Sequence, residues 1–160
     1  MNPPPPPDRL RLFKGSAALL LGSALNHFGD RLLGVKIELF RGLLGFDGWW
    51  ILDVFAVPFL VGILVAAIFG LGGKWLCYFP PLIVRSVSYM GIYFGAGAPP
   101  GTSLIPLGWW GFFVILAVEA AAVGGVVGEI MIKSTYGRKP AGASDAASPP
   151  HSGHGDDAVA

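Results

Sequence analysis

Charge and cysteine are both scarce in this sequence, and each shortage excludes a class of protein. Only 13% of the 160 residues are charged, whereas soluble domains carry about 25%. The single cysteine, Cys77, excludes an internal disulfide and a C-x-x-C zinc or redox site. The formal net charge is +1 and no basic cluster with interleaved aromatic residues occurs, so we expect no nucleic-acid partner.

Motifs of catalysis and cofactor binding are missing as well. The sequence has no G-x-S-x-G elbow, no H-E-x-x-H motif and no second histidine one helical turn from His27. Residues 70–74 resemble a phosphate loop, but Trp75 stands where that motif needs Ser or Thr. A lipid-modifying enzyme would lack an identifiable nucleophile or base. We therefore expect neither an enzyme nor a metal or cofactor site.

Apolar residues are what the sequence has in abundance. They make up 53% of the chain, and the mean hydropathy is +0.62. This composition predicts an all-α integral membrane protein. A membrane-spanning helix needs about 20 mostly apolar residues, and the segments 48–73 and 108–132 meet that need. We predict a transmembrane helix in each.

Each of these segments opens with the tripeptide Gly-Trp-Trp. Tryptophan is typical of the membrane–water interface, so we interpret Trp49, Trp50, Trp109 and Trp110 as interfacial anchors. The two segments diverge after the tripeptide. We therefore place the pairs in opposite leaflets and do not interpret them as a gene duplication. Pro58 should kink the first helix.

Small side chains recur every fourth residue in both segments. Such rows let a second helix approach closely, so we expect them to be helix-packing faces. The residues are Gly62, Ala66 and Gly70 in the first segment, and Ala117, Ala121, Gly125, Ala120, Gly124 and Gly128 in the second.

The flanking regions are expected to lie outside the bilayer core. Residues 1–8 form a proline-rich disordered arm, and residues 133–160 form a disordered cytoplasmic tail. Apolar and charged residues alternate at helical intervals over 9–47, which predicts two amphipathic interfacial helices separated near Gly29. The alternative is a short span over 12–28.

The connection over 74–107 contains Arg85 and several prolines. It predicts an outer loop with a re-entrant or short half-helix over 80–94, whose aromatic residues we interpret as belt residues in preference to a quinone or lipid groove. A third span here is the alternative, but it places Arg85 in lipid at about 2.5–3.5 kcal/mol. Lys and Arg gather before residue 48 and after residue 132, which favours two spans with both termini cytoplasmic. The absence of a clear targeting signal suggests a bacterial inner membrane.

Glu119 is the strongest functional candidate because ionisable groups near a bilayer centre are costly. It could carry a proton or a cation, pair with Arg85, or contact a partner. Asp53 lies one turn into its segment, so we interpret it as a hydrated interfacial acid.

These features predict a non-catalytic subunit, or an assembly or scaffold factor, of a larger membrane complex. Its expected partners are the lipid bilayer and other membrane subunits, or copies of itself as a homo-oligomer, bound through the small-residue faces. The alternative is a homo-oligomeric channel or transporter component that uses Glu119.

Overall fold

The computed structural model describes residues 9–34, 40–41, 48–97 and 100–136. These residues form four helical rods in chain order. The first rod is α1 (Arg9–Leu33). The second rod joins α2 (Gly48–Ile51), the π-helical turn η1 (Leu52–Ala56) and α3 (Val57–Phe69). The third rod joins the 3-10 helix η2 (Gly73–Tyr78), α4 (Phe79–Gly91) and the π-helical turn η3 (Ile92–Ala96). The fourth rod is α5 (Leu107–Tyr136).

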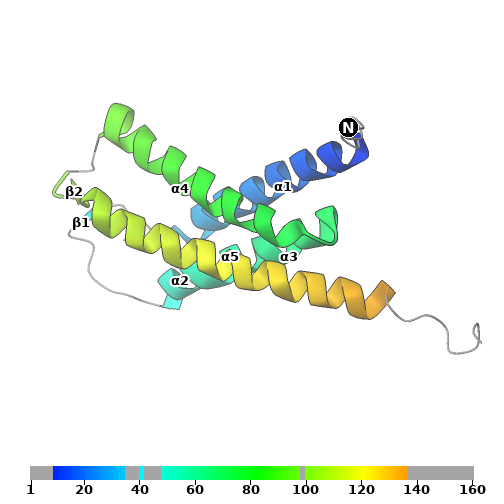
Figure 1. Ribbon diagram of the computed structural model, residues 1–160. Coiled ribbons are helices and arrows are strands. Elements are labelled where there is room, and N and C mark those ends of the chain that lie inside the picture. Colours follow the sequence, from blue (N-terminus) through cyan, green and yellow to red (C-terminus); the bar gives the residue numbers. More distant parts are fainter. Residues whose placement is uncertain (1–8, 35–39, 42–47, 98–99, 137–160) are drawn as a thin grey trace, which may run out of the picture.

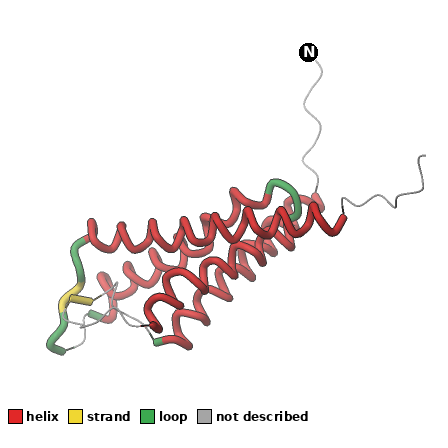
Figure 2. The backbone as a smooth tube through the Cα atoms, turned by 90° about the horizontal axis from the view of Figure 1, so that it is seen from below, coloured by secondary structure: helices red, strands yellow, loops and turns green. Residues whose placement is uncertain are grey.

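The rods alternate in direction along the chain. Figures 1 and 2 show α1 beginning, and α5 ending, at one end of the molecule, which we call the terminal end. The short strands β1 (Phe40–Arg41) and β2 (Ser103–Leu104) pair antiparallel at the opposite end, which we call the strand end. Residues 40–41 therefore do not belong to the helical region predicted over 9–47.

The closest helix contact joins the second and fourth rods. A methyl group added at Gly62 would overlap the carbonyl oxygen of Ala121, and one added at Gly124 would overlap that of Phe59. Further along the same seam, a Cβ on Gly128 would lie 2.7 Å from that of Ala66. Trp50 near the start of the second rod contacts Phe113 near the start of α5, and Ala66 near the end of α3 lies against Gly128 near the end of α5. The two rods therefore run parallel, and the small-residue rows face each other within one chain.

Gly70 does not share this packing role. Its φ of 87° is left-handed, and a Cβ there would meet nothing within 4 Å. It follows the last residue of α3 and donates its N–H to Ala66 O at 2.8 Å. Glycine is favoured at such helix ends because it carries no Cβ. Gly70 thus ends the helix.

The first rod packs antiparallel on α3 through small residues. A Cβ on Gly22 would lie 2.9 Å from Val65 Cγ2, and one on Gly29 would lie 2.6 Å from Val57 Cγ1. The predicted break near Gly29 is wrong, because this glycine lies inside one continuous helix. It is required for close approach to the neighbouring helix, and not for a turn. Of the residues that flank this helix, 1–8, 35–39 and 42–47 lie outside the described part of the chain.

The third rod is not a half-helix. Pro80 and Pro81 occupy its early α-helical positions, where a missing N–H is tolerated. Cys77 near its start lies against Gly125, whereas the Tyr89 ring contacts Trp110, near the start of α5, in a tilted arrangement with the ring centroids 4.9 Å apart. The rod therefore returns along most of α5, antiparallel to it, instead of stopping midway.

Both Gly-Trp-Trp tripeptides lie at the strand end. Trp50 meets Phe113 edge-on at 6.1 Å, and both belong to a buried cluster on which Trp110 packs. The prediction put the two pairs at opposite ends of the helices, whereas the structure brings them together at one end, because the second and fourth rods are parallel. In each pair the first tryptophan, Trp49 or Trp109, points outward.

The outer surface of the described rods is rich in large apolar side chains. Two helical segments, Gly48–Phe69 and Leu107–Ser134, are long and apolar enough to cross a membrane. The first and third rods also expose apolar residues along their lengths. Examples from the four rods are Leu20, Leu21, Phe28, Leu60, Ile83, Val87, Ile115 and Val123.

We predict that Gly62→Ala destabilises the fold by about 1–3 kcal/mol, the range of overpacking substitutions, because its methyl group has no space beside Ala121. Gly111→Ala is the control, since nothing lies within 4 Å of a Cβ at that position of α5. Alanine favours a helix over glycine by about 1 kcal/mol, so the control should be neutral or stabilising. SDS unfolding followed by circular dichroism measures both; equal stability of the two variants would contradict the seam.

Candidate functional site

A buried ion pair joins the second and third rods near the strand end. Arg85 Nη2 lies 3.2 Å from Asp53 Oδ2. The two residues are 2% and 0% exposed, so water screens the pair little. The same nitrogen donates to the backbone carbonyl of Asp53 at 3.3 Å.

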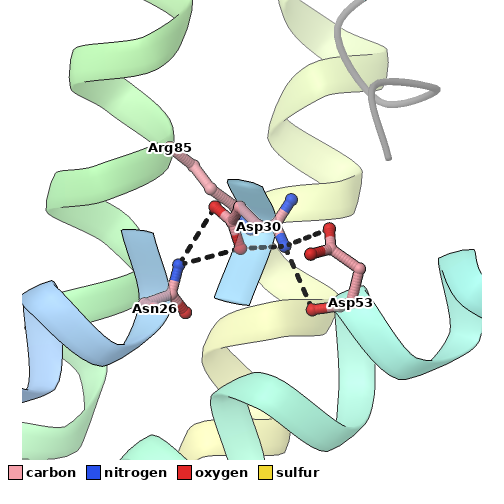
Figure 3. A network of polar contacts seen from close by, with 4 residues as sticks. All are labelled: Asn26, Asp30, Asp53 and Arg85. Carbon is pink, nitrogen blue, oxygen red and sulfur yellow. Dashed lines mark hydrogen bonds and ion pairs between the residues drawn. The ribbon is translucent and has the colours of Figure 1, made fainter. Parts of the chain in front are cut away.

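The first rod contributes an acid and an amide to this pair (Figure 3). Asp30 Oδ1 lies 3.8 Å from Arg85 Nη2, and the Asp30 side chain retains 21% exposure. Asn26, one turn earlier and fully buried, donates from Nδ2 to both Asp30 oxygens at 3.3 Å. We call Asn26, Asp30, Asp53 and Arg85 the Arg85 network.

Local helix distortion explains why Asp53 offers its carbonyl to Arg85. In the π-helical turn η1 the N–H of Val57 bonds to Leu52 O, five residues back. The next N–H in that pattern would reach Asp53 O, but it belongs to Pro58, which has none. The guanidinium supplies a donor to this carbonyl. Pi turns of this kind recur at functional sites.

The structure changes the predicted environments of two site residues. Asp53 is not a hydrated interfacial acid, because it is buried and paired. Arg85 does not lie in an outer loop but points into the bundle (Figure 3). A long guanidinium side chain on the returning rod can reach acids on two other rods.

Glu119 does not join the Arg85 network. It is exposed on α5, so the predicted alternative of pairing with Arg85 is wrong. Its neighbours along that outer face, one turn to either side, are the exposed residues Ile115 and Val123. Glu119 is thus an outward carboxylate on an apolar surface.

Asn26 and Asp30 were not predicted as site residues, although the sequence carries a signal for them. The buried residues of α1 are Ala18, Gly22 and Asn26, spaced by four, and Asp30 continues the series. Residues four apart lie on one helix face. A stripe that begins with small residues and ends in polar ones indicates a packed face with a buried polar contact.

The terminal end has a separate polar contact. Glu129 Oε1 on α5 accepts the backbone N–H groups of Gly72 at 2.9 Å and Lys74 at 3.1 Å. These groups open the 3-10 helix η2, where N–H donors lack helical partners. Glu129 is only 9% exposed, so it fixes the turn between the second and third rods and does not simply extend into water.

Cys77 is buried beside this turn. Its thiol hydrogen lies within reach of two carbonyls, with Sγ 3.4 Å from Gly62 O and 3.3 Å from Gly73 O. A thiol buried in this way is a poor nucleophile.

Among the residues that the structure describes, no group of three or more His, Cys, Asp or Glu side chains could hold a metal ion. No protein family, curated protein or solved structure that we compared with the chain matches it. Function must therefore be inferred from the geometry of the chain itself.

We predict that Arg85→Met destabilises the fold by about 3–5 kcal/mol, because it leaves the Asp53 carboxylate buried without its partner. Adding Asp53→Leu should restore much of the lost stability, since an apolar pair needs no compensating charge. The control is Lys133→Met, which removes an exposed base on α5 and should change the free energy of unfolding by no more than about 0.5 kcal/mol. Denaturation in detergent measures all three; a double variant less stable than Arg85→Met would contradict the prediction.

Proposed function

We propose that the chain is an integral membrane protein whose four rods all cross the bilayer, and that it serves as a non-catalytic subunit of a larger membrane complex. The distribution of side chains supports the first part. Large apolar residues are exposed on every rod, whereas the Arg85 network is buried between rods. Lipid favours this arrangement, because polar groups inside the membrane must find partners within the protein.

The parallel seam supports four crossings over two. If the second and fourth rods both span the membrane in one direction, the third rod must cross in the other. The first rod, antiparallel to the second, then brings both termini to one side. Among the described residues, five bases lie at the terminal end and two at the strand end. They are Arg9, Arg11, Lys14, Lys74 and Lys133 at the former, and Arg31 and Arg41 at the latter.

This charge bias favours a cytoplasmic terminal end, because short cytoplasmic loops are enriched in Lys and Arg. The proposed topology thus keeps both termini in the cytoplasm. The lipid bilayer is the first partner, and the inner membrane of a bacterium is the proposed location.

Glu119 is the observation that supports a subunit role. It lies near the middle of α5 and points away from the bundle. A charged group at the centre of a lipid-facing helix costs about 2.5–3.5 kcal/mol on insertion scales. A partner that covers this position and donates a hydrogen bond would remove that cost.

The surface beside Glu119 suits a helix. An apolar groove of about 400 Å³ runs between the second and fourth rods, lined by Phe55, Phe59, Ala120 and Val123 among others. A helix could place apolar side chains there and a donor against Glu119. Apart from Ala120, which lines the groove, the packed small residues such as Gly62, Gly124 and Gly128 are not available for this role, because they lie against the neighbouring rod within the chain.

The expected partner is a helix of a different membrane protein with a Lys, Arg, His or hydroxyl side chain. A symmetric second copy would set Glu119 against itself. The exposed neighbours on this face, such as Phe112 and Ile115, supply no donor. A heteromeric contact therefore fits the chemistry better than a homo-oligomer or a channel lined by Glu119.

We predict that cysteines introduced at Gly48 and Gly108 react with an impermeant maleimide from the same side of the membrane, because both tripeptides lie at the strand end. Cysteines at Leu71 and Ser134 should react from the opposite side. The native Cys77 should stay unlabelled in folded protein, which makes the wild type the control. Labelling of Gly48→Cys and Gly108→Cys from opposite sides would establish the two-span topology instead.

For the subunit role, we predict that a photo-crosslinker at Ile115 captures a transmembrane segment of a second protein in native membranes. The crosslinked partner peptide should carry a donor side chain, and Glu119→Leu should reduce capture at least tenfold, whereas Glu119→Gln should retain it. A crosslinker at Leu20, exposed on α1, is the matched control. Mass spectrometry identifies the peptide. Crosslinks only between copies of this chain, or to lipid alone, would overturn the heteromeric role.

A further inference from the structure

The terminal end carries a cluster of bases that its acids do not neutralise. Among the described residues, the acid at this end is Glu129, and the bases are Arg9, Arg11, Lys14, Lys74 and Lys133. Glu129 is largely buried and accepts two backbone N–H groups of the turn that opens η2. Within the described part of the chain, Arg11, Lys14 and Lys74 form no ion pair with an acid. These bases are therefore available to an anion from outside the chain.

Arg11 is held in place by contacts with the turn between the second and third rods. Its guanidinium carbon lies 5.5 Å from the centre of the Phe69 ring, at the end of α3. Its Nη2 lies 3.7 Å from the position that a Cβ on Gly72 would take. A cation–π contact uses the face of a guanidinium, whereas its N–H groups lie in its plane and stay free to donate. Arg11 is exposed, so these groups can reach a ligand.

Two exposed lysines accompany Arg11, one on the same helix and one on the neighbouring rod. Lys14 follows Arg11 by three residues on α1, a spacing that makes the two side chains neighbours. A Cβ on Gly15 would lie 3.7 Å from Leu76 Cδ2, so this turn of α1 packs against η2. Lys74 stands two residues before Leu76 on η2. Bases from two rods therefore gather in one region of the terminal end.

The surroundings of these bases suit the headgroup region of a bilayer. Trp75 follows Lys74 and is 66% exposed, and the centre of its ring lies 6.0 Å from that of Tyr78. Trp and Tyr are enriched at headgroup depth. Apolar side chains are exposed further along both rods, for example Leu20 on α1 and Phe79 on α4. A ligand with an anionic head and a hydrocarbon chain would meet the bases and the apolar surface together.

We propose that Arg11, Lys14 and Lys74 bind the phosphate of an anionic phospholipid in the cytoplasmic leaflet. The planar guanidinium of Arg11 can donate two parallel N–H groups to phosphate oxygens, and the two lysines add positive charge around them. The inference rests on the proposed function, because it requires the terminal end to lie at a bilayer surface. It adds the class of lipid and the residues that bind it.

A headgroup with a net negative charge fits these bases better than a zwitterionic one. The phosphate of a zwitterionic lipid is accompanied by the cation of the same headgroup, which the three bases would repel. In phosphatidylglycerol the phosphate carries the whole charge of the headgroup. The acyl chains also hold this phosphate at the depth of Trp75 and Tyr78, whereas a soluble phosphate gains nothing from the apolar surface. The occupant is thus a lipid and not a free anion.

The test is native mass spectrometry of the full-length protein in a neutral detergent. The protein is titrated with phosphatidylglycerol, with phosphatidylcholine of the same acyl chains, or with inorganic phosphate. We expect phosphatidylglycerol to bind about fivefold more tightly than phosphatidylcholine, or better, which is the effect of one base near a lipid surface. An excess of inorganic phosphate should not displace it. Equal binding of the two lipids would overturn the proposal, and displacement by inorganic phosphate would overturn the assignment to a lipid.

Variants distinguish a built site from general surface charge. Arg11→Gln should lower the affinity for phosphatidylglycerol about fivefold or more. Lys14→Gln, which keeps the contact of Arg11 with Phe69, should lower it as well. Lys133→Gln is the matched control, because it removes an exposed base of the same end from α5, whose end lies apart from the start of α1 (Figure 1). Equal losses in Lys133→Gln and Arg11→Gln would contradict a site at Arg11. Circular dichroism checks that each variant is folded.

The failure of this inference is distinguishable from that of the proposed function. Lipid binding in detergent does not depend on the direction in which the rods cross a bilayer, whereas maleimide labelling of the introduced cysteines does. Loss of lipid selectivity together with the labelling pattern of four crossings would overturn this inference alone. Labelling in the two-span pattern would overturn the proposed topology, whichever lipid binds.

Discussion

The close parallel packing of α3 against α5 is the constraint on which the rest of the structure depends. At Gly62 and Gly124 the two backbones approach so closely that neither position has room for a methyl group. Contacts of this kind require small residues and gain from dispersion between the two helix backbones. Two long helices that are separated by one connection can lie parallel only if the connection runs back along their whole length.

That requirement explains the third rod. Its sequence is a poor choice for a helix surrounded by lipid, since it contains two prolines and an arginine. Its position between other rods resolves each of these difficulties. The prolines fall in the first turn of α4, and the arginine finds acceptors on two neighbouring rods. One of these acceptors, Asp53 O, is available because Pro58 interrupts the hydrogen bonding of the second rod. A defect in one helix is thus satisfied by a charged side chain of another.

Much of the architecture was predictable from the sequence, and the reasons for the errors are physical. The two apolar helices and their small-residue rows follow from hydropathy and spacing, and the structure has long apolar helices at both places. The direction of packing does not follow, because a row of small residues accepts a parallel or an antiparallel neighbour equally well. The expectation of an outer loop around Arg85 came from treating it as a charge exposed to lipid, whereas the structure buries it against Asp53 and Asp30. Its partners Asp53 and Asp30 are 32 and 55 positions away in the chain, so no local pattern connects them.

A carboxylate that is removed from water needs a partner, and the acids Asp30 and Asp53 differ from Glu119 in where that partner comes from. Asp30 and Asp53 turn inward and share a base that the chain itself provides. Glu119 turns outward from the middle of α5, and the only described base inside the bundle between the two ends, Arg85, already serves the inward acids. If the rods cross the bilayer, compensation for Glu119 must come from its own protonation or from another molecule. Protonation alone would leave a carboxylic acid with no acceptor in lipid, and would give no reason for the apolar groove beside it. A partner helix accounts for both features, which is why the outward acid points to an assembly while the inward acids complete the fold.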